Sequence, residues 1–506
     1  MEKLTQEIVP ILVLCAVIAV VVVRLPKVDV GHTPGFLHRR TLNWVPLGLT
    51  YAFLYMGRYN MTVLKNEGGI LQRDFGNIDF WGSLVYGVSF LINGPLADRL
   101  GGRRTILISA GGALAANALI GVLWMSGAID GGSSVALAAL FTLNMYFQSF
   151  GAVSIVKVNA SWFHLRERGT FGGIFGILIS LGLYFAFDWG ARIAAAGCPA
   201  CDLHAHNSKS PLPTPIESLG LAWLFLVPAA ILAVFWVLSF ALVRDTPSKA
   251  GLADFDVEDA SSGQAETPEP AARVIARMLK NPVILTIAII ELCSGFLRQG
   301  ILKWSGDFAK GVGAGASYVN AHWGMVSCIA GIAGGMFAGV ISDHLFHSRR
   351  PPVSTALYLI MLAGALGMIP LLGAPVAVSW IIAVMAMAII GVHGMLSGVA
   401  SQDFGGRLHT GVAVGLIDGF VYLGTALQDQ VYGGYGSLLP EKGTEAAKLA
   451  GNWQGWPIAM VPMAVLGLVL SYRLRAARVA PRGSGTAPPG SPSLPHARAR
   501  PAAPSR

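Results

Sequence analysis

Two arginines stand inside long apolar stretches of this sequence. Arg58 lies in YMGRYN and Arg298 lies in FLRQGIL. A charged side chain at the centre of a membrane costs at least about 2.5–3.5 kcal/mol on insertion scales, so such residues usually have a function. The guanidinium group stays charged, and its planar fork of donors matches a phosphate or a carboxylate. The pair predicts an anion clamp; the structural alternative is that each arginine pairs with an acid inside the membrane.

Three further residues are candidates for the same site. Tyr51 and Tyr55 precede Arg58 by seven and three residues, so a helix would place all three on one face. Lys157 lies near the end of a later apolar stretch, in SIVKVNASWF. It could extend a positive path for the substrate or hold a contact between helices.

Two acids also fall within apolar stretches. Glu291 precedes Arg298 by two helical turns and shares its face, and Asp418 lies midway along another stretch. Either acid could couple transport to protons, neutralise an arginine in the empty site, or bind the amino group of a zwitterionic substrate. A buried carboxylate satisfied by its neighbours is the structural alternative.

The elements that carry these residues read as membrane helices. Hydrophobic residues make up 54% of the chain and charged residues 12%, about half the charge density of a soluble domain. Each apolar stretch approaches the ~20 residues that cross a bilayer. The stretch 8–23 predicts one extra, retained N-terminal transmembrane helix, with a signal peptide as the alternative. Twelve further stretches follow in two sets of six, at 44–63, 79–97, 105–125, 135–157, 170–189 and 219–242, and at 283–303, 319–341, 353–373, 377–399, 410–432 and 456–472.

The two sets of six repeat each other. Each carries an arginine in its first helix and a similar loop after its second helix, GPLADRLGGRRT and GVISDHLFHSRR. Parallel repeats with the binding site at their interface are a known plan of transporters. The loops supply candidate gate residues, whose ion pairs would break in each cycle: Asp98, Arg103, Arg104, Asp343, Arg349 and Arg350.

The chain divides accordingly into five segments. Residues 1–42 hold the extra helix and a cytoplasmic link, and residues 43–243 and 281–474 form two six-helix bundles. A polar linker, 244–280, joins the bundles, and 475–506 is a Pro- and Arg-rich disordered tail. Of 36 Lys and Arg, 24 fall on the side of the linker and tail and 8 on the other side, with 4 inside the spans. The positive-inside rule therefore places the linker and the C-terminus in the cytoplasm; Lys303, at a helix end, is expected to reach the membrane surface.

The sequence resembles the organophosphate:phosphate antiporter family of the major facilitators, which includes glycerol-3-phosphate and hexose-phosphate transporters. The resemblance runs from about Asn43 to Leu474 and rests on YAFLYMGRYN, YFQSFGAVSIVKVNASWF, RDTPSKAGL and FLRQGILKWS. It implies a major facilitator fold and exchange of a phosphate ester for inorganic phosphate. It also implies that Arg58 and Arg298 bind the phosphate, with Tyr55 and Tyr422 nearby.

The sequence departs from the family pattern inside the expected cavity. Basic residues of the family are replaced here by Tyr59, Phe90 and Ile179, and a glutamate of the family is replaced by Cys328. Glu291 and Asp418 are acids where a relative has neutral residues. The cavity has therefore lost positive charge and gained negative charge, which counts against glycerol-3-phosphate itself as the substrate.

We predict an all-α polytopic membrane protein of the major facilitator fold, with two six-helix bundles and an extra N-terminal helix. It would be a monomeric secondary transporter in the inner membrane, carrying a small organic anion, a phosphate ester, by alternating access. The alternatives are a membrane sensor of sugar phosphates and a proton-coupled carrier of a zwitterionic or non-phosphorylated substrate. No nucleophile, nucleotide loop or metal constellation suggests an enzyme, a cofactor or nucleic-acid binding; CPACDLHAH, with Cys198 and Cys201, is a weak disulfide or metal motif.

Overall fold

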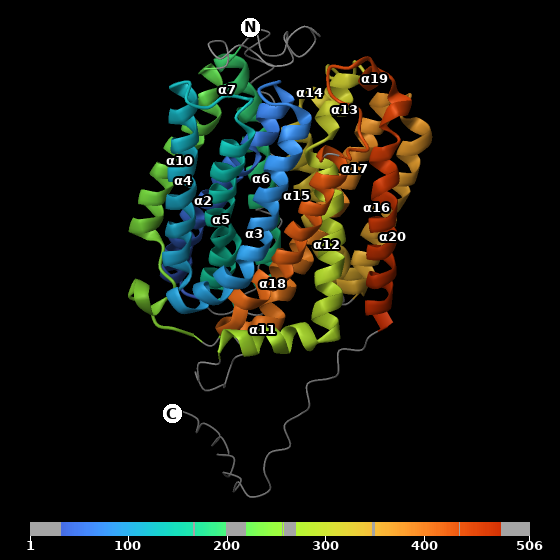
Figure 1. The fold of residues 1–506 in the computed structure, drawn as a ribbon. Helices are drawn as coiled ribbons and strands as arrows, with labels where there is room; N and C mark the ends of the chain where they lie inside the picture. The colour runs from blue at the N-terminus through green and yellow to red at the C-terminus, as the bar shows by residue number, and fades with distance from the viewer. Residues whose placement is uncertain are drawn as a thin grey trace, which may run out of the picture.

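The fold is a set of long helices that run side by side, as Figure 1 shows. The computed structural model describes residues 32–164, 167–198, 219–255, 257, 270–346, 350–434 and 436–476. All regular secondary structure in these residues is helical. The predicted helix at 8–23 lies outside the described residues, as do Cys201 and the C-terminal tail beyond residue 476. Cys198, which is disulfide-bonded, directly follows α7.

The first group of helices occupies the N-terminal half of the chain. Its members are α2 (Pro34–Asn66), α3 (Gln72–Leu100), α4 (Gly102–Met125), α5 (Ser134–Asn159), α6 (Arg168–Tyr184) and α10 (Trp223–Leu242). A π-helical turn, η2 (Phe185–Trp189), continues α6 into the short α7 (Gly190–Gly197).

The second group occupies the C-terminal half. Its members are α12 (Pro282–Leu302), α15 (Trp323–Phe346), α16 (Arg350–Leu371), α17 (Pro375–His393), α18 (Ser401–Gly433) and α20 (Gly455–Ala476). A π-helical segment, η5 (Gly394–Ala400), joins α17 to α18. The short helix α11 (Ala271–Lys280) lies at one end of the molecule, and α13 (Ser305–Gly311), α14 (Tyr318–Ala321) and α19 (Glu445–Lys448) lie at the other (Figure 1).

Ten helical segments of the described chain are long and apolar enough to cross a membrane. With α2 and α15, they correspond to the twelve predicted stretches of the two repeats. Helix α2 is more polar than the rest because it carries Arg39, Arg40, Arg58 and Lys65. Asn281 begins α12 by accepting a hydrogen bond from the amide of Val283, and Pro282 occupies the first turn.

The two groups of helices meet along two pairs: α3 packs on α18, and α6 packs on α15. Each pair joins the second helix of one group to the fifth helix of the other. The contacts therefore follow the two-fold pseudo-symmetry that the sequence repeat predicts.

Glycines set the distance between α3 and α18. A Cβ atom added at Gly76 would lie 2.2 Å from the backbone of Gly433, and one at Gly94 would lie 2.5 Å from the carbonyl oxygen of Gly411. Gly87 and Gly419 meet between these two levels. Small residues let the backbones of membrane helices touch, so the two halves close on each other along most of α3.

Gly76→Val is expected to prevent this closure. Overpacking a tight contact costs about 1–3 kcal/mol, enough to reduce the closed population roughly tenfold. The measurement is the rate at which a membrane-impermeant reagent labels a cysteine placed at Ser83, in a protein without its native cysteines. Ser83 is buried and its hydroxyl bonds to Asp429 of α18, so faster labelling reports separation of the two helices.

Gly373→Val is the matched control, because nothing lies within 4 Å of a Cβ atom added there. Equal labelling rates in the two valine variants would contradict the role of the glycine contact.

Candidate functional site

Arg58 is buried at the contact between the two halves. Its Nη1 donates to the hydroxyl of Tyr422 in α18 (2.8 Å), its Nη2 to the hydroxyl of Tyr86 in α3 (2.9 Å), and its Nε to Oε1 of Gln148 in α5 (3.2 Å). Its guanidinium carbon also lies 4.5 Å from the ring centroid of Tyr55. All of these partners are neutral. They stabilise the positive charge of Arg58 through their dipoles, but none of them supplies a negative charge.

Hydrogen bonds made by side-chain amides of α4 and α5 hold α2 so that Arg58 takes this position. Asn144 of α5 donates to the carbonyl of Gly57 (2.8 Å), and its side-chain oxygen accepts from Asn117 of α4 (2.9 Å) and from Gln148 (3.0 Å). A Cβ atom at Gly57 would lie 2.7 Å from the amide of Asn117, so glycine is required for this approach. The residue before Arg58 is therefore fixed by α4 and α5 together.

Arg298 also approaches the ring of Tyr422. Its guanidinium carbon is 5.9 Å from the Tyr422 ring centroid, while that of Arg58 is 5.7 Å from it. These two distances limit the separation of the guanidinium carbons to about 12 Å. The Arg298 side chain is buried, and its Nε has no hydrogen-bond partner among the described residues.

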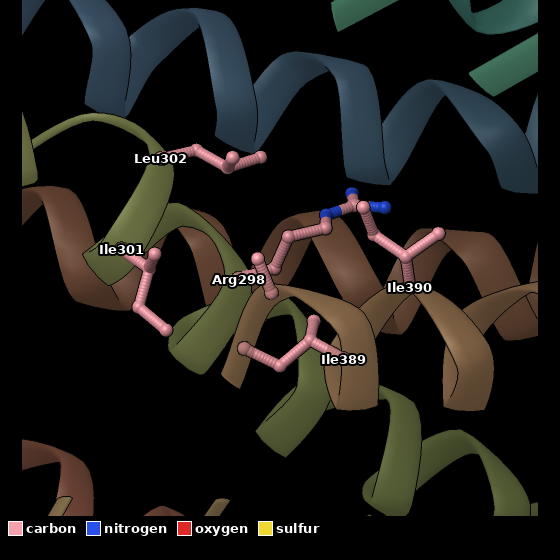
Figure 2. Close-up of a pocket in the computed structure, with 6 residues that line it drawn as sticks. Arg298, Ile301, Leu302, Ile389 and Ile390 are labelled. Carbon is pink, nitrogen blue, oxygen red and sulfur yellow. The ribbon is translucent and has the colours of Figure 1, made fainter. Parts of the chain in front are cut away.

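Figure 2 shows the direction of the Arg298 side chain. The guanidinium group points away from Ile301 and Ile389, towards a blue ribbon of the N-terminal half. The narrow hollow beside it is lined by apolar side chains of α12 and α17 and has no room for a water molecule. The charge of Arg298 is therefore directed to the contact between the halves, where Arg58 also lies.

Neither arginine forms an ion pair with a carboxylate among the described residues. The buried Glu291 faces His393 instead, with 3.1 Å between Oε2 and Nδ1. Asp418 accepts a hydrogen bond from Ser397. The alternative in which each arginine is held by a membrane-embedded acid is thus not what this structure contains.

The aromatic candidates gather around Arg58. Tyr51 and Tyr55 stack edge to face, and the Tyr51 ring centroid is 6.0 Å from the Arg58 guanidinium carbon. Tyr86 and Tyr422 have ring centroids only 3.9 Å apart, so their hydroxyls reach Arg58 side by side. Tyr86 is absent from the sequence-based site because no spacing within α3 relates it to α2.

Lys157 does not join the arginines. Its ammonium group lies 2.6 Å from Asp98, whose two carboxylate oxygens also accept the backbone amides of Gly411 (3.0 Å) and Val412 (3.1 Å) in α18. Lys157 is thus placed in the interhelical contact that the sequence left open as its alternative role. Asp98 links the two halves directly, as a gate residue would.

The other candidate gate residues are placed differently. Arg103 donates to the carbonyl of Phe240 in α10, and its amide donates to Asp245 at the start of the linker, so neither contact reaches the C-terminal half. They are local because α4 begins next to the end of α10. Arg104 is exposed. The side chains of Asp343 and Arg350, and the whole of Arg349, lie outside the described part of the structure.

A second charged cluster, near the α13 end, was not expected. Lys303 is buried against Asp79 of α3 and Asp429 of α18. Lys65, at the end of α2, is 2.5 Å from Asp307 of α13. The expectation that Lys303 reaches the membrane surface is wrong, because these two carboxylates hold its ammonium group between the halves.

The loop that follows α18 covers this cluster. The ammonium group of Lys442 donates to the backbone carbonyls of Lys65 (3.2 Å) and Asn66 (2.6 Å). Burial lowers the pKa of Lys442 to about 8. Lys310 bonds to the carbonyl of Asn66 and lies 3.3 Å from Glu67. The α13 end is therefore closed by contacts between the halves.

Two helical groups that meet around a pair of buried arginines define a polytopic membrane carrier. The chain belongs to the Major Facilitator Superfamily, whose family model matches residues 47–428. Transport is the common activity of this family, so the chain is a transport protein and not an enzyme. The fold class and family predicted from the sequence are confirmed.

Among curated proteins, the chain is similar to the glycerol-3-phosphate transporter of Bacillus subtilis, with 24% identity over 84% of this chain and 90% of that protein. It is also similar to the membrane sensor protein UhpC of Escherichia coli, with 25% identity over 79% and 86%. The phosphoglycerate transporter protein of Salmonella typhimurium is 24% identical over 81% and 85%. The matches confirm the likeness to the organophosphate transporters.

Solved structures show the same fold. A bacterial homolog of the human lysosomal transporter Spinster, in an inward-facing and unoccupied conformation, has a TM-score of 0.54 at 13% identity, over 88% of this chain and 97% of that one. The nucleoside transporter NupG has a TM-score of 0.52 at 14% identity, over 85% and 98%.

Lys303→Met is expected to destabilise the protein strongly, because it leaves two buried carboxylates, Asp79 and Asp429, without their shared cation. Removing one partner of a buried ion pair costs about 3–5 kcal/mol. The measurement is the melting temperature of the purified protein. Lys448→Met is the control, since its pair with Glu445 is exposed. A melting temperature equal to that of the control would show that the cluster does not hold the halves together.

Proposed function

We propose that this chain is a secondary transporter of small phosphate esters, with Arg58 and Arg298 as the ligands of the phosphate group. The proposal rests on the burial of the two arginines, on their proximity and on the lack of a neutralising acid beside them. Both are buried at the contact between the halves, within about 12 Å of each other, and neither is neutralised by an acid. In addition, Nε of Arg298 finds no hydrogen-bond partner in the residues that the structure describes.

The chemistry of the site favours a phosphate over a neutral solute. A buried charge without a counter-charge is costly, and a bound anion removes that cost. Phosphate offers several acceptor oxygens, which suit two guanidinium groups that each donate in pairs. The names of the B. subtilis and S. typhimurium relatives, a glycerol-3-phosphate transporter and a phosphoglycerate transporter, support the same class of substrate.

The position of the arginines also suits alternating access. Arg58 belongs to the first half and Arg298 to the second, so an anion held by both would link the halves to each other. Asp98 links α3 to α18 on one side of this level, and Lys303 links them on the other. Breaking one set of contacts while the other holds would open the site to one side of the membrane at a time.

Inorganic phosphate is the natural counter-substrate in this scheme, because it offers the same group to the same clamp. The transporter would work as a monomer in the inner membrane. The α11 end, with the linker and the C-terminus, would face the cytoplasm, since 24 of the 36 Lys and Arg fall on that side.

A membrane sensor is the second candidate, because one relative is named a membrane sensor protein. A sensor could use the same clamp to bind a phosphate ester without moving it. Binding and exchange must therefore be measured separately.

Arg58→Lys and Arg298→Lys are each expected to weaken binding of phosphate esters about thirtyfold or more, because lysine cannot reproduce the fork of donors. The assay is the exchange of internal inorganic phosphate for labelled external esters in proteoliposomes, with binding measured on the same purified protein. Lys448→Arg, on an exposed side chain, is the control for handling and insertion.

Normal binding by either lysine variant would contradict the clamp. Binding without exchange in the parent protein would favour the sensor. No binding of any phosphate ester would refute the proposed substrate class.

The orientation is tested with reporter fusions. A reporter that is active only outside the cytoplasm, fused after residue 476, is expected to be inactive, because the basic residues concentrate on that side. The same reporter inserted after Gly373, between α16 and α17, is expected to be active. The reverse pattern would overturn the orientation.

A further inference from the structure

A second polar region adjoins the arginine clamp, on the C-terminal half alone. It consists of Glu291 and Ser294 of α12, His393 of α17, Ser397 of η5 and Asp418 of α18, and we name it the acidic subsite. Nothing in the clamp requires these residues, and two carboxylates next to a site for an anion are unfavourable for binding. Their presence therefore needs a reason of its own.

Three residues of α12 leave polar atoms without partners along one helical face. Glu291, Ser294 and Arg298 are spaced three and four residues apart, so they follow one another on the same side of α12. Oε1 of Glu291, Oγ of Ser294 and Nε of Arg298 are all buried and have no hydrogen-bond partner in the part of the chain that the structure describes. Glu291 and Ser294 are fully buried. Buried polar atoms are almost always bonded, so three in a row mark a surface that is made for a ligand.

The packing of α12 on α18 brings the other carboxylate to this face. A Cβ atom at Gly295 would lie 1.9 Å from the carbonyl oxygen of Val421, so the helices touch beside Ser294. Asp418 and Tyr422 flank Val421 on α18, one turn apart. Tyr422 contacts both arginines, and Asp418 lies about 6 Å further along the helix axis, since four residues rise 1.5 Å each.

The two acids are only partly satisfied. One oxygen of Glu291 faces His393 Nδ1, and one oxygen of Asp418 accepts from Ser397. Oε1 of Glu291 has no hydrogen-bond partner among the described residues. The site thus has a cationic level, at Arg58 and Arg298, and an acidic level about one to two helical turns away.

We propose that the acidic subsite binds a protonated amine carried by the substrate, so that the transported molecule is a zwitterion: a phosphate ester whose other end is an aminoalkyl group. This inference rests on the proposed function, because the clamp fixes the phosphate end. An ammonium group brings both the positive charge and the several donors that the free carboxylate oxygens lack, and Ser294 can bond between the two ends. A hydroxyl group would supply donors but would leave the buried negative charge uncompensated.

The departures from the family pattern agree with this assignment. The chain has Tyr59, Phe90 and Ile179 at positions where the resembling family carries basic residues, and Glu291 and Asp418 are additional acids. A zwitterion needs less positive charge around it than a dianion does.

The test compares two esters that share the phosphate and differ at the other end. Binding of phosphoethanolamine and of glycerol 3-phosphate is measured by calorimetry on the full chain in nanodiscs. The parent is expected to bind phosphoethanolamine about thirtyfold more tightly, as for a desolvated charge pair. In Glu291→Gln the ratio of the two affinities should fall to near one, and Asp418→Asn should lower the same ratio, which covers the case in which one variant does not fold. Glu445→Gln, an exposed substitution of the same kind, should leave the ratio as in the parent.

The outcomes separate the two proposals. If both esters bind with equal affinity in the parent, or if the ratio survives both acid variants, the amine subsite is refuted and the phosphate clamp stands. If the variants keep the ratio but lose accumulation driven by a pH gradient, the acids are a proton site and the amine assignment is overturned. If neither ester binds, the proposed function fails, and the subsite fails with it.

Discussion

The structure depends on how two guanidinium charges are kept inside the membrane without a carboxylate beside them. Arg58 is stabilised by three neutral acceptors and by tyrosine rings, whereas Arg298 contacts the ring of Tyr422 and donates no hydrogen bond to any described residue. Such an arrangement is stable enough to fold but electrostatically incomplete, because neutral dipoles compensate a charge less well than an anion does. The asymmetry suggests that Arg58 is a preformed ligand and that Arg298 gains most when an anion binds.

The halves contact each other on both sides of the level at which Arg58 and Arg298 lie, and the two sets of contacts differ in kind. Near the α13 end, Lys303 and Lys65 form buried ion pairs between the halves. At the other end, the crossing contact is made by Asp98 and backbone amides of α18, and Lys157 completes it from the same half. Buried ion pairs lose their attraction but regain hydration when water enters. A cluster of this kind can therefore hold the closed state firmly and still be released when the halves rotate.

The sequence predicts the helices and the two arginines because both follow from the membrane itself. Apolar length specifies the spans, and the cost of a charge makes Arg58 and Arg298 stand out. The contacts that the site residues make with other helices cannot be predicted in this way. Tyr86 and Gln148, which accept from Arg58, and His393, which faces Glu291, lie on other helices. The packing of helices on one another, not spacing along one helix, brings them to the site. The sequence shows that Lys157 lies within an apolar stretch, and this made it a candidate for the site of the arginines. The sequence does not show which face of the helix Lys157 occupies.

The pair Tyr59 and Gln299 shows how the repeat shapes the site. Each follows the arginine of its own half, and the two bond to each other across the interface, with 3.0 Å between Gln299 Nε2 and the Tyr59 hydroxyl. Helices α2 and α12 thus meet through a neutral contact at the symmetry-related positions, and the arginines lie beside it. Tyr59 replaces a basic residue of the resembling family, so the substitution exchanges a charge for a link between the halves. Because the site has one positive charge fewer at this level, the acids Glu291 and Asp418 make a larger part of its charge negative. A purely anionic ligand therefore no longer matches the whole site.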